Sequence, residues 1–306
     1  MYNFWKGFWL MAHPKIWIAS TVPLLVGTAL AYGMTGMFNL YWFIVSMIGL
    51  YFIEIGKNAL NDLVDYLTGV DLAVAPENLT PFSGGRYRVL VKGYLSLQEA
   101  AFITMTMLTI GGAFGLYITI FHEQQIFWIG TLGLFLAVAY SLPPFKLSYR
   151  GLGEIAVGIA FGPLIVSGAF VIQTHFLSSE VFLVSLPIGF LIANFLFINQ
   201  YPDYEADKKC CKNNWLVRLG KDRGIKVFIT LFALAYLSII VLSFATCNPL
   251  WLLSFISLPS VIRAIRTAIL SEGKIPELLV ANLCTLRAYQ INGLLMLISA
   301  VAMRFF

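Results

Sequence analysis

Nine apolar stretches follow one another along the chain, and each is close to the length of a membrane-spanning helix. A helix needs about 20 mainly apolar residues to cross the hydrocarbon core of a bilayer. The stretches lie near residues 15–34, 40–60, 99–121, 125–141, 151–173, 179–199, 225–246, 249–271 and 281–303. No long polar segment divides them into blocks, so we expect a single transmembrane domain over residues 1–306. The predicted fold class is all-α, a polytopic membrane protein with about nine transmembrane helices.

The charged residues are too few for a soluble protein, and they are unevenly placed. They make up 11% of the chain, and the mean hydropathy is +0.82, whereas a soluble domain carries about 25% charged residues. Lys and Arg gather in every second connection. None occurs in the connections near 35–39, 122–124, 174–178 and 247–248. This asymmetry predicts a multi-pass protein with a cytoplasmic N-terminus and an outer C-terminus.

Three connections on the predicted cytoplasmic side are long or strongly patterned. They lie near residues 63–98, 142–152 and 200–224, whereas the outer connections are short. Loops carry function when a rigid scaffold presents them. We therefore expect these three loops to form a cap over an active site that faces the cytoplasm.

Five of the six aspartates lie in two short clusters at the ends of predicted spans. Residues 58–71 read N-A-L-N-D-L-V-D-Y-L-T-G-V-D, and residues 199–207 read N-Q-Y-P-D-Y-E-A-D. Acids at such places cost free energy unless they are paired or bound to metal. One cluster alone would be interpreted as a helix cap or a polar rim. Two clusters on the same side favour one cation-binding site built from two halves of the sequence.

The spacing within the clusters predicts their local geometry. Asn61 and Asp65 are four residues apart and share a helix face, and Gly69 is expected to end that helix so that Asp71 can turn back. In the second cluster the spacing of four predicts one stripe along a helix that Pro202 loosens. Oxygen ligands without nearby His or Cys suit Mg²⁺, which substrate phosphates commonly complete. The clusters therefore imply a phosphate-bearing substrate.

Basic residues in the three loops supply the charge that a phosphate needs. Arg binds phosphate in a bidentate manner, whereas Lys acts as a point charge, although basic loops alone also serve as topology signals. The candidates for substrate binding are Asn61, Arg86, Arg88, Lys146, Tyr149, Arg150, Asn199, Lys212 and Arg218. Glu54, inside the second span, either supports the first cluster or faces the bundle. We assign no role to His13.

Several separate motifs, in this order, resemble those of the UbiA superfamily of intramembrane prenyltransferases. They include S-G-G-R-Y-R-V-L-V-K-G at 83–93, P-P-F-K-L-S-Y-R-G-L-G-E at 143–154, and the run from 203 to 220 that begins D-Y-E-A-D-K-K. The segment N-D-L-V-D-Y-L-T-G-V-D is most similar to the menaquinone-type branch, which prenylates 1,4-dihydroxy-2-naphthoate. The resemblance covers nearly the whole chain. It implies nine helices around a central cavity that opens to the cytoplasm and to lipid.

The resemblance also implies a ligand set. Two aspartate motifs of the family hold Mg²⁺ and the diphosphate of an isoprenoid donor. The metal ligands implied here are Asn61, Asp62, Asp65, Asp71, Asp203 and Asp207. Of these, Asp65, Asp71, Asp203 and Asp207 are the expected catalytic residues.

Three positions depart from the wider family pattern and concern the acceptor more than the reaction class. Gly69 stands where the ubiquinone branch has its last aspartate, and Asp71 takes that place as in the menaquinone branch. Asn199 stands where some relatives have Asp. The Arg-Pro pair usual before the first span is His13-Pro14 here.

The function expected is Mg²⁺-dependent transfer of a prenyl group from an allylic polyprenyl diphosphate to an aromatic, quinone-precursor-like acceptor, with release of diphosphate. The expected partners are the isoprenoid diphosphate, an aromatic acceptor and the lipid bilayer, and no nucleic acid. Two alternatives use the same motifs: a terpene cyclase of this superfamily, which needs no acceptor, and a lipid prenyltransferase acting on glycerol phosphate. A cation-coupled transporter is the non-enzymatic alternative, and its site is expected near the bilayer midplane.

Overall fold

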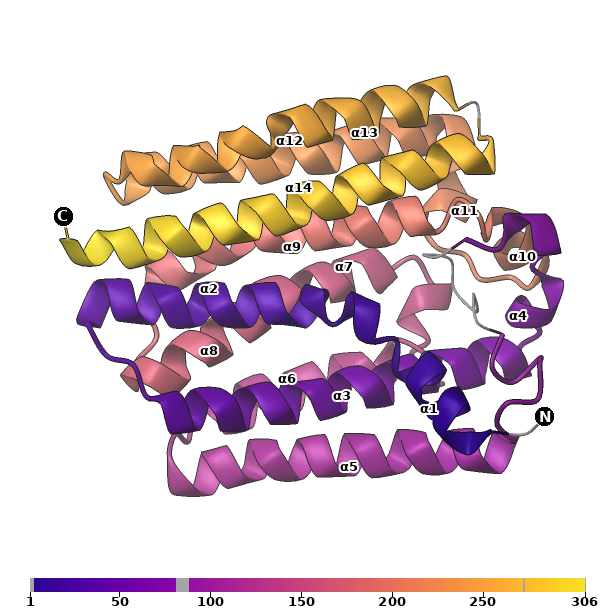
Figure 1. The fold of residues 1–306 in the computed structure, drawn as a ribbon, viewed down its shortest axis with the longest axis horizontal. Helices are drawn as coiled ribbons and strands as arrows, with labels where there is room; N and C mark the ends of the chain where they lie inside the picture. The colour runs from indigo at the N-terminus through magenta and orange to yellow at the C-terminus, as the bar shows by residue number, and fades with distance from the viewer. Residues whose placement is uncertain (1–2, 81–87, 272, 306) are drawn as a thin grey trace.

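The computed structural model describes residues 3–80, 88–271 and 273–305, and these residues are almost entirely helical, without a β-strand. Figure 1 shows the long helices lying side by side. The α-helices are α1 (Phe4–Ala12), α2 (Ile18–Thr35), α3 (Leu40–Leu67), α4 (Val70–Ala73), α5 (Leu97–Phe121), α6 (Ile126–Ala139), α7 (Gly153–Ile159), α8 (Ile165–Thr174), α9 (Ser179–Asn199), α10 (Tyr204–Lys209), α11 (Trp215–Leu219), α12 (Lys221–Ala245), α13 (Leu258–Leu270) and α14 (Ile275–Ala302).

Eight helical segments within the described ranges are long and apolar enough to cross a membrane. They are Ile18–Thr35, Leu40–Leu67, Leu97–Phe121, Gly153–Thr174, Ser179–Asn199, Lys221–Ala245, Pro249–Leu270 and Glu277–Phe305. The helix α6 is also apolar but has only 14 residues. These nine segments coincide with the nine predicted stretches to within a few residues at most boundaries. The prediction of an all-α protein with about nine membrane helices is confirmed.

Two of the spans are not uniform α-helices. The span Gly153–Thr174 joins α7 and α8 through one π-helical turn, Ala160–Leu164, which contains Pro163. Proline lacks the backbone N–H that an α-helix would use, and a π turn absorbs the resulting break. The span Pro249–Leu270 begins as a 3₁₀ helix, Pro249–Ser257, and continues as α13.

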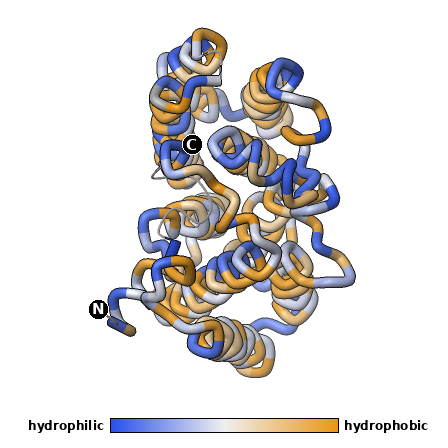
Figure 2. Tube along the Cα trace, turned by 90° about the vertical axis from the view of Figure 1, so that its right-hand side faces the viewer, coloured by the Kyte–Doolittle hydropathy of each residue, from blue (hydrophilic) through white to orange (hydrophobic). Residues whose placement is uncertain are grey.

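Four of the short helices lie at one end of the bundle. Figure 1 shows α1, α4, α10 and α11 on the right, at the end of the bundle where the N-terminus lies. The C-terminus lies at the opposite end. Helix α4 contacts α10, so the segments that follow α3 and α9 meet there. Figure 2 looks along the bundle from this side and shows hydrophilic stretches between apolar helices. Both aspartate clusters therefore lie at the same end of the bundle.

The ends of α3 and α9 differ from each other. Helix α3 stops where predicted, because Gly69 adopts a left-handed φ of 84° that residues with a Cβ rarely adopt. The single helical stripe predicted through Asn199, Asp203 and Asp207 is wrong. Helix α9 ends at Asn199, and α10 begins only after Asp203. Pro202 lies in the intervening turn, since proline restricts the residue before it to non-helical conformations.

Close backbone packing holds α2 at the centre of the bundle. A Cβ at Gly33 would overlap the carbonyl oxygen of Ala300 on α14, and a Cβ at Gly27 would overlap that of Val166 on α8. Helices in membranes associate through such small residues because lipid provides little hydrophobic driving force between them. These two glycines set the distance of α2 from its neighbours.

We predict that Gly33→Ala lowers the thermal stability of the detergent-solubilised protein. The added methyl group forces α2 and α14 apart, and overpacking of this kind costs about 1–3 kcal/mol. The matched control is Gly115→Ala on α5, where nothing lies within 4 Å of the Cβ position and the replacement of a helical glycine is neutral or stabilising. A Gly33→Ala protein that melts at or above the wild-type temperature contradicts this packing.

Candidate active site

A cavity of about 930 Å³ runs into the bundle from the end where the aspartates lie. Its inner walls are mostly apolar and come from helices of both halves of the chain. Examples are Leu108, Phe114, Leu134 and Ile165. Its polar end is lined by Asn61, Asp62, Asp65, Asn199, Asp203, Asp207 and Lys212. The cavity thus joins a polar mouth to an apolar interior, as expected for a ligand with a charged head and a hydrocarbon tail.

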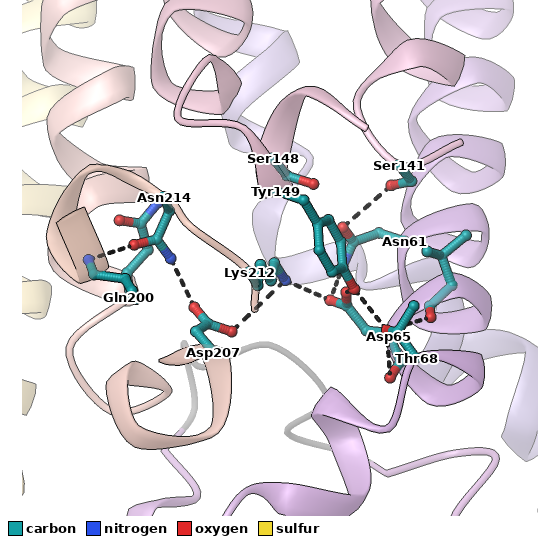
Figure 3. A network of polar contacts seen from close by, with 12 residues as sticks. Asn61, Asp65, Thr68, Ser141, Ser148, Tyr149, Gln200, Asp207, Lys212 and Asn214 are labelled. Atoms are coloured by element: carbon teal, nitrogen blue, oxygen red, sulfur yellow. Dashed lines mark hydrogen bonds and ion pairs between the residues drawn. The ribbon is translucent and has the colours of Figure 1, made fainter. Parts of the chain in front are cut away.

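Lys212 connects the two aspartate clusters. Its Nζ lies 2.7 Å from Oδ2 of Asp65 and 4.0 Å from Oδ1 of Asp207 (Figure 3). Burial by itself lowers the pKa of Lys212, but the attraction of Asp65 and Asp207 outweighs it and raises that pKa well above the ordinary value. The lysine therefore stays charged. The two clusters, distant in sequence, meet around one positive charge.

The carboxylate of Asp65 is held by three side chains. Besides Lys212, it accepts a hydrogen bond from Asn61 Nδ2 at 2.9 Å and from the Tyr149 hydroxyl at 2.8 Å (Figure 3). Burial raises the pKa of Tyr149, so its hydroxyl stays protonated and donates. Thr68 lies within hydrogen-bond distance of the same hydroxyl, at 2.6 Å, and fixes the ring from one turn below. Asp65 is therefore oriented from three separate elements.

The second cluster is less fully satisfied. Oδ2 of Asp207 accepts from Asn214 Nδ2 at 2.7 Å, whereas its buried Oδ1 has no hydrogen-bond donor among the described residues. Asp203 is buried and lines the same cavity. Asn199 accepts from Asn282 on α14 at 2.7 Å. A buried carboxylate oxygen that lacks a donor is the kind of group that a bound cation would satisfy.

The remaining acids of the first cluster lie close by. Asp62 pairs with His13, whose Nε2 lies 3.1 Å from Oδ2 of the carboxylate. Asp71, in α4, is buried just outside the residues that line the cavity. Arg88 donates to the backbone carbonyl oxygen of Asp71 at 3.3 Å. Of these two acids, Asp62 lines the cavity and Asp71 does not.

The structure brings only some of the predicted basic residues to this mouth. Lys146 Nζ lies 4.7 Å from the centroid of the Tyr149 ring, but Lys146 does not line the cavity. Arg150 is exposed, and the guanidinium of Arg218 donates to the backbone carbonyl oxygens of Asn213 and Arg150. Neither arginine lines the cavity. Arg86 lies outside the described residues. A substrate-binding role for these basic residues stays a prediction.

Several polar residues at the cavity were not predicted as site residues. Two are His13 and Asn214, described above. Glu154 is fully buried, lines the cavity, and accepts from Gln200 Nε2 and from the Trp215 backbone. Glu54 and Lys57 form an ion pair deeper along α3. One sequence signal could have indicated both Glu54 and Glu154, because each is an acid at or within an apolar span.

The side chains at the mouth fit a hard divalent cation by type, although they do not form a complete metal centre. Carboxylate and amide oxygens are the ligands that Mg²⁺ prefers. Within the described ranges, no group of three or more His, Cys, Asp or Glu side chains converges closely enough to hold an ion. Mg²⁺ commonly takes only one or two carboxylates and completes its shell with water and substrate phosphate. A cation here would therefore bind together with an anionic ligand.

Burial raises the pKa of two acids that lie outside the membrane-spanning helices, Asp71 and Asp207. It raises the pKa of Asp71 to about 8, with a further contribution from the neighbouring Asp62 and Asp65. It raises the pKa of Asp207 to about 7, although Lys212 and Asn214 oppose the shift. In the unfolded chain both groups titrate near 4. Folding without a cation therefore takes up protons, and the associated stability is lost as pH rises towards 7 and 8.

We predict that, in EDTA, the melting temperature of the protein falls between pH 6 and pH 8.5. Mg²⁺ should restore more stability at pH 8.5 than at pH 6, because at the lower pH it has to displace protons from the carboxyl groups. Thermal unfolding followed in parallel with EDTA and with Mg²⁺ measures both effects. Asp71→Asn should flatten the profile in EDTA. If Mg²⁺ raises the melting temperature equally at pH 6 and pH 8.5, the protonated carboxyl groups of Asp71 and Asp207 are not at the cation site.

Comparison with known proteins agrees with this geometry. The model of the UbiA prenyltransferase family matches residues 1–274. A 2-carboxy-1,4-naphthoquinone phytyltransferase from Synechocystis sp. is 30% identical over 266 residues, which cover 85% of this chain and 82% of that protein. A 1,4-dihydroxy-2-naphthoate octaprenyltransferase from Bacillus subtilis is 27% identical over 267 residues, or 86% and 82% of the two chains.

The fold is also similar to that of a solved relative. The structure of a UbiA homolog from Archaeoglobus fulgidus, bound to GPP and Mg²⁺, superposes with a TM-score of 0.69 at 19% identity. The match covers 98% of this chain and 100% of the other. The family match over most of the chain, the naphthoate-type relatives and the shared helical fold lead to one conclusion: this chain is a multi-pass membrane protein that belongs to the UbiA prenyltransferase family.

Proposed function

We propose that this enzyme uses Mg²⁺ to transfer a prenyl group from an allylic polyprenyl diphosphate to an aromatic acceptor of the naphthoate type, with release of diphosphate. The observation that carries the proposal is the meeting of Asp65 and Asp207 around Lys212 at the polar mouth of an apolar cavity. The names of the relatives in Synechocystis and Bacillus subtilis support the acceptor class and a place in quinone biosynthesis.

The residues at the mouth suit a diphosphate bound with Mg²⁺. We propose Asn61, Asp62, Asp65, Asp71, Asp203 and Asp207 as the groups that hold the ion. When bound, Mg²⁺ neutralises the diphosphate and stabilises the charge that develops on it as a leaving group. Lys212 is already charged and lies beside the same carboxylates, so it can stabilise the developing negative charge without reorganisation. Tyr149 and Asn61 keep Asp65 in one orientation.

The apolar part of the cavity suits the chemistry that follows. The C–O bond between the allylic carbon and the diphosphate breaks, and its electron pair leaves with the diphosphate. A carbon of the electron-rich ring then bonds to the allylic carbon and loses its proton, which restores aromaticity. Walls such as Leu108, Phe114 and Ile165 accommodate the prenyl chain and exclude water that would otherwise capture the cation.

The placement of the carboxylates argues against a cation-coupled transporter. A transporter of that kind binds its ion near the bilayer midplane. Asp65 is instead two residues from the end of α3, and Asp207 lies beyond the end of α9. A terpene cyclase or a glycerol phosphate prenyltransferase would need the same mouth, and the naphthoate-type relatives favour the aromatic acceptor over both.

The orientation in the membrane forms part of the proposal. We place the N-terminus and the mouth of the cavity on the cytoplasmic side, since the Lys- and Arg-rich connections lie there. The loops near 63–98, 142–152 and 200–224 then cap the active site. Tyr149 from the second loop and Lys212 from the third reach Asp65, which supports this arrangement.

The direct test is an assay with purified protein, an allylic polyprenyl diphosphate and 1,4-dihydroxy-2-naphthoate, with Mg²⁺ or EDTA. We predict a prenylated aromatic and released diphosphate only with Mg²⁺. Asp65→Asn and Asp207→Asn should each lower turnover by at least about 100-fold, because each removes a negative charge from the diphosphate and metal site. The matched control is Asp222→Asn, since Asp222 is the sixth aspartate and is exposed on α12.

The products separate the alternatives. Diphosphate release with a hydrocarbon or alcohol and no need for an acceptor supports a cyclase, and a prenylated glycerol phosphate supports the lipid enzyme. Turnover that survives both active-site substitutions, or that falls equally in Asp222→Asn, contradicts the proposal.

A further inference from the structure

A second charged group lies inside the cavity, deeper along α3 than the aspartates. Lys57 Nζ is 2.8 Å from Oε1 of Glu54. The hydroxyl of Ser20, on α2, donates to the other oxygen of Glu54. All three residues line the cavity. Both charges belong to the membrane-spanning part of α3, where ionisable residues are costly and commonly mark a functional site.

The pair of Lys57 and Glu54 lies on the same helix as the residues of the mouth, further into the cavity. Lys57 precedes Asn61 by four residues, so the two lie on one face about 6 Å apart along the helix axis. Glu54 precedes Asp65 by eleven residues, about 16 Å along the axis. The pair therefore lies one turn or more inside the cavity. A diphosphate held at the mouth would place its allylic carbon towards this level.

Lys57 has capacity for one more ligand. An ammonium group donates three hydrogen bonds. Among the described residues, two acceptors lie within reach of Nζ: Glu54, and Asn58 Oδ1 at 3.0 Å. The lysine side chain is 24% exposed, whereas that of Glu54 is 2% exposed. Phe161, which also lines the cavity, has its ring centroid 5.2 Å from Nζ. An anionic group of an aromatic ligand could therefore reach Nζ beside an aromatic wall.

The charges of the cavity show which substrate this lysine suits. The lysines and arginines that line it within the described ranges are Lys212 at the mouth and Lys57 inside. Lys212 serves the carboxylates and the diphosphate, and the prenyl chain carries no charge. A second positive charge inside the cavity is therefore suited to an anion on the other substrate. Glu54, which accepts a hydrogen bond from Ser20, pairs with Lys57 and holds its ammonium group away from the aspartates at the mouth.

We propose that Lys57, paired with Glu54, binds the carboxylate of an aromatic acceptor acid. This inference rests on the proposed function and adds to it the side chain that recognises the carboxylate of the acceptor. The enzyme should then distinguish an acceptor that carries a carboxylate from the same ring system without one.

The experiment compares two ligands, 1,4-dihydroxy-2-naphthoate and naphthalene-1,4-diol, and four proteins. The proteins are the wild type, Lys57→Met, Lys57→Arg and, as a control, Lys226→Met, whose lysine is exposed on α12. Dissociation constants are measured calorimetrically in detergent with Mg²⁺ and a non-hydrolysable donor analogue present. The KM values of donor and acceptor are measured for the acid. Both sets are repeated at raised salt concentration.

We expect the wild type to bind the acid about 10- to 100-fold more tightly than the diol, since a charged hydrogen bond is worth about 1.5–3 kcal/mol. Lys57→Met should lose most of this preference and raise the KM of the acid, with the KM of the donor unchanged. Lys57→Arg should retain the preference, and Lys226→Met should match the wild type.

Three results overturn the inference. The first is a wild type that binds acid and diol equally, which decides the matter even if Lys57→Met fails to fold. The second is a Lys57→Met protein that keeps the preference. The third is a rise in the KM of the donor, which would assign Lys57 to the diphosphate. If the wild type prenylates neither ligand, the proposed function itself fails, and this is visible before any variant is made.

Discussion

The ammonium group of Lys212 is the interaction on which the mouth of the cavity depends. It lies between carboxylates that come from the two halves of the chain, Asp65 on α3 and Asp207 on α10. Without the ammonium group between them, these two buried carboxylates would repel each other across a medium of low dielectric constant. One positive charge between them offsets that repulsion and joins the ends of the two halves. The same arrangement can accept a divalent cation together with an anionic ligand, because the charges of the added cation and anion largely offset each other.

Polarity along α3 organises the rest of the site. Asp65 and Asn61 lie at the mouth, Lys57 and Glu54 lie deeper, and the helix beyond them is apolar. The donor that we propose, with a diphosphate head and a hydrocarbon tail, matches this order of polar and apolar groups, and the acceptor acid that we propose would bind beside Lys57. The left-handed glycine at 69 ends the helix and lets Asp71 return towards the mouth. Thus one helix provides six of the charged and amide side chains that line the site: Glu54, Lys57, Asn58, Asn61, Asp62 and Asp65.

Much of this could be predicted from the sequence, because membrane helices are long, apolar and separated by charged connections. The nine spans, the end of α3 at Gly69 and the two acidic clusters all follow from local patterns. The packing of loops does not. Arg150 and Arg218 looked equivalent to Lys212, yet only Lys212 reaches Asp65. The pair of Glu54 and Lys57 was not predicted either, since two charges within one apolar span hardly change its hydropathy. Pro202 was expected to loosen a helix, but it lies in a turn between two helices.

The central claim is that Asp65 and Asp207 act on one ligand, and a double-mutant cycle tests it most directly. The affinity for an allylic thiodiphosphate with Mg²⁺ would be measured by calorimetry for the wild type, Asp65→Asn, Asp207→Asn and the double variant. Two groups that share a ligand are coupled, so the double variant should lose less binding free energy than the sum of the single losses, by about 1 kcal/mol or more. Losses that add within about 0.5 kcal/mol would show that the two carboxylates act separately, and would contradict the account.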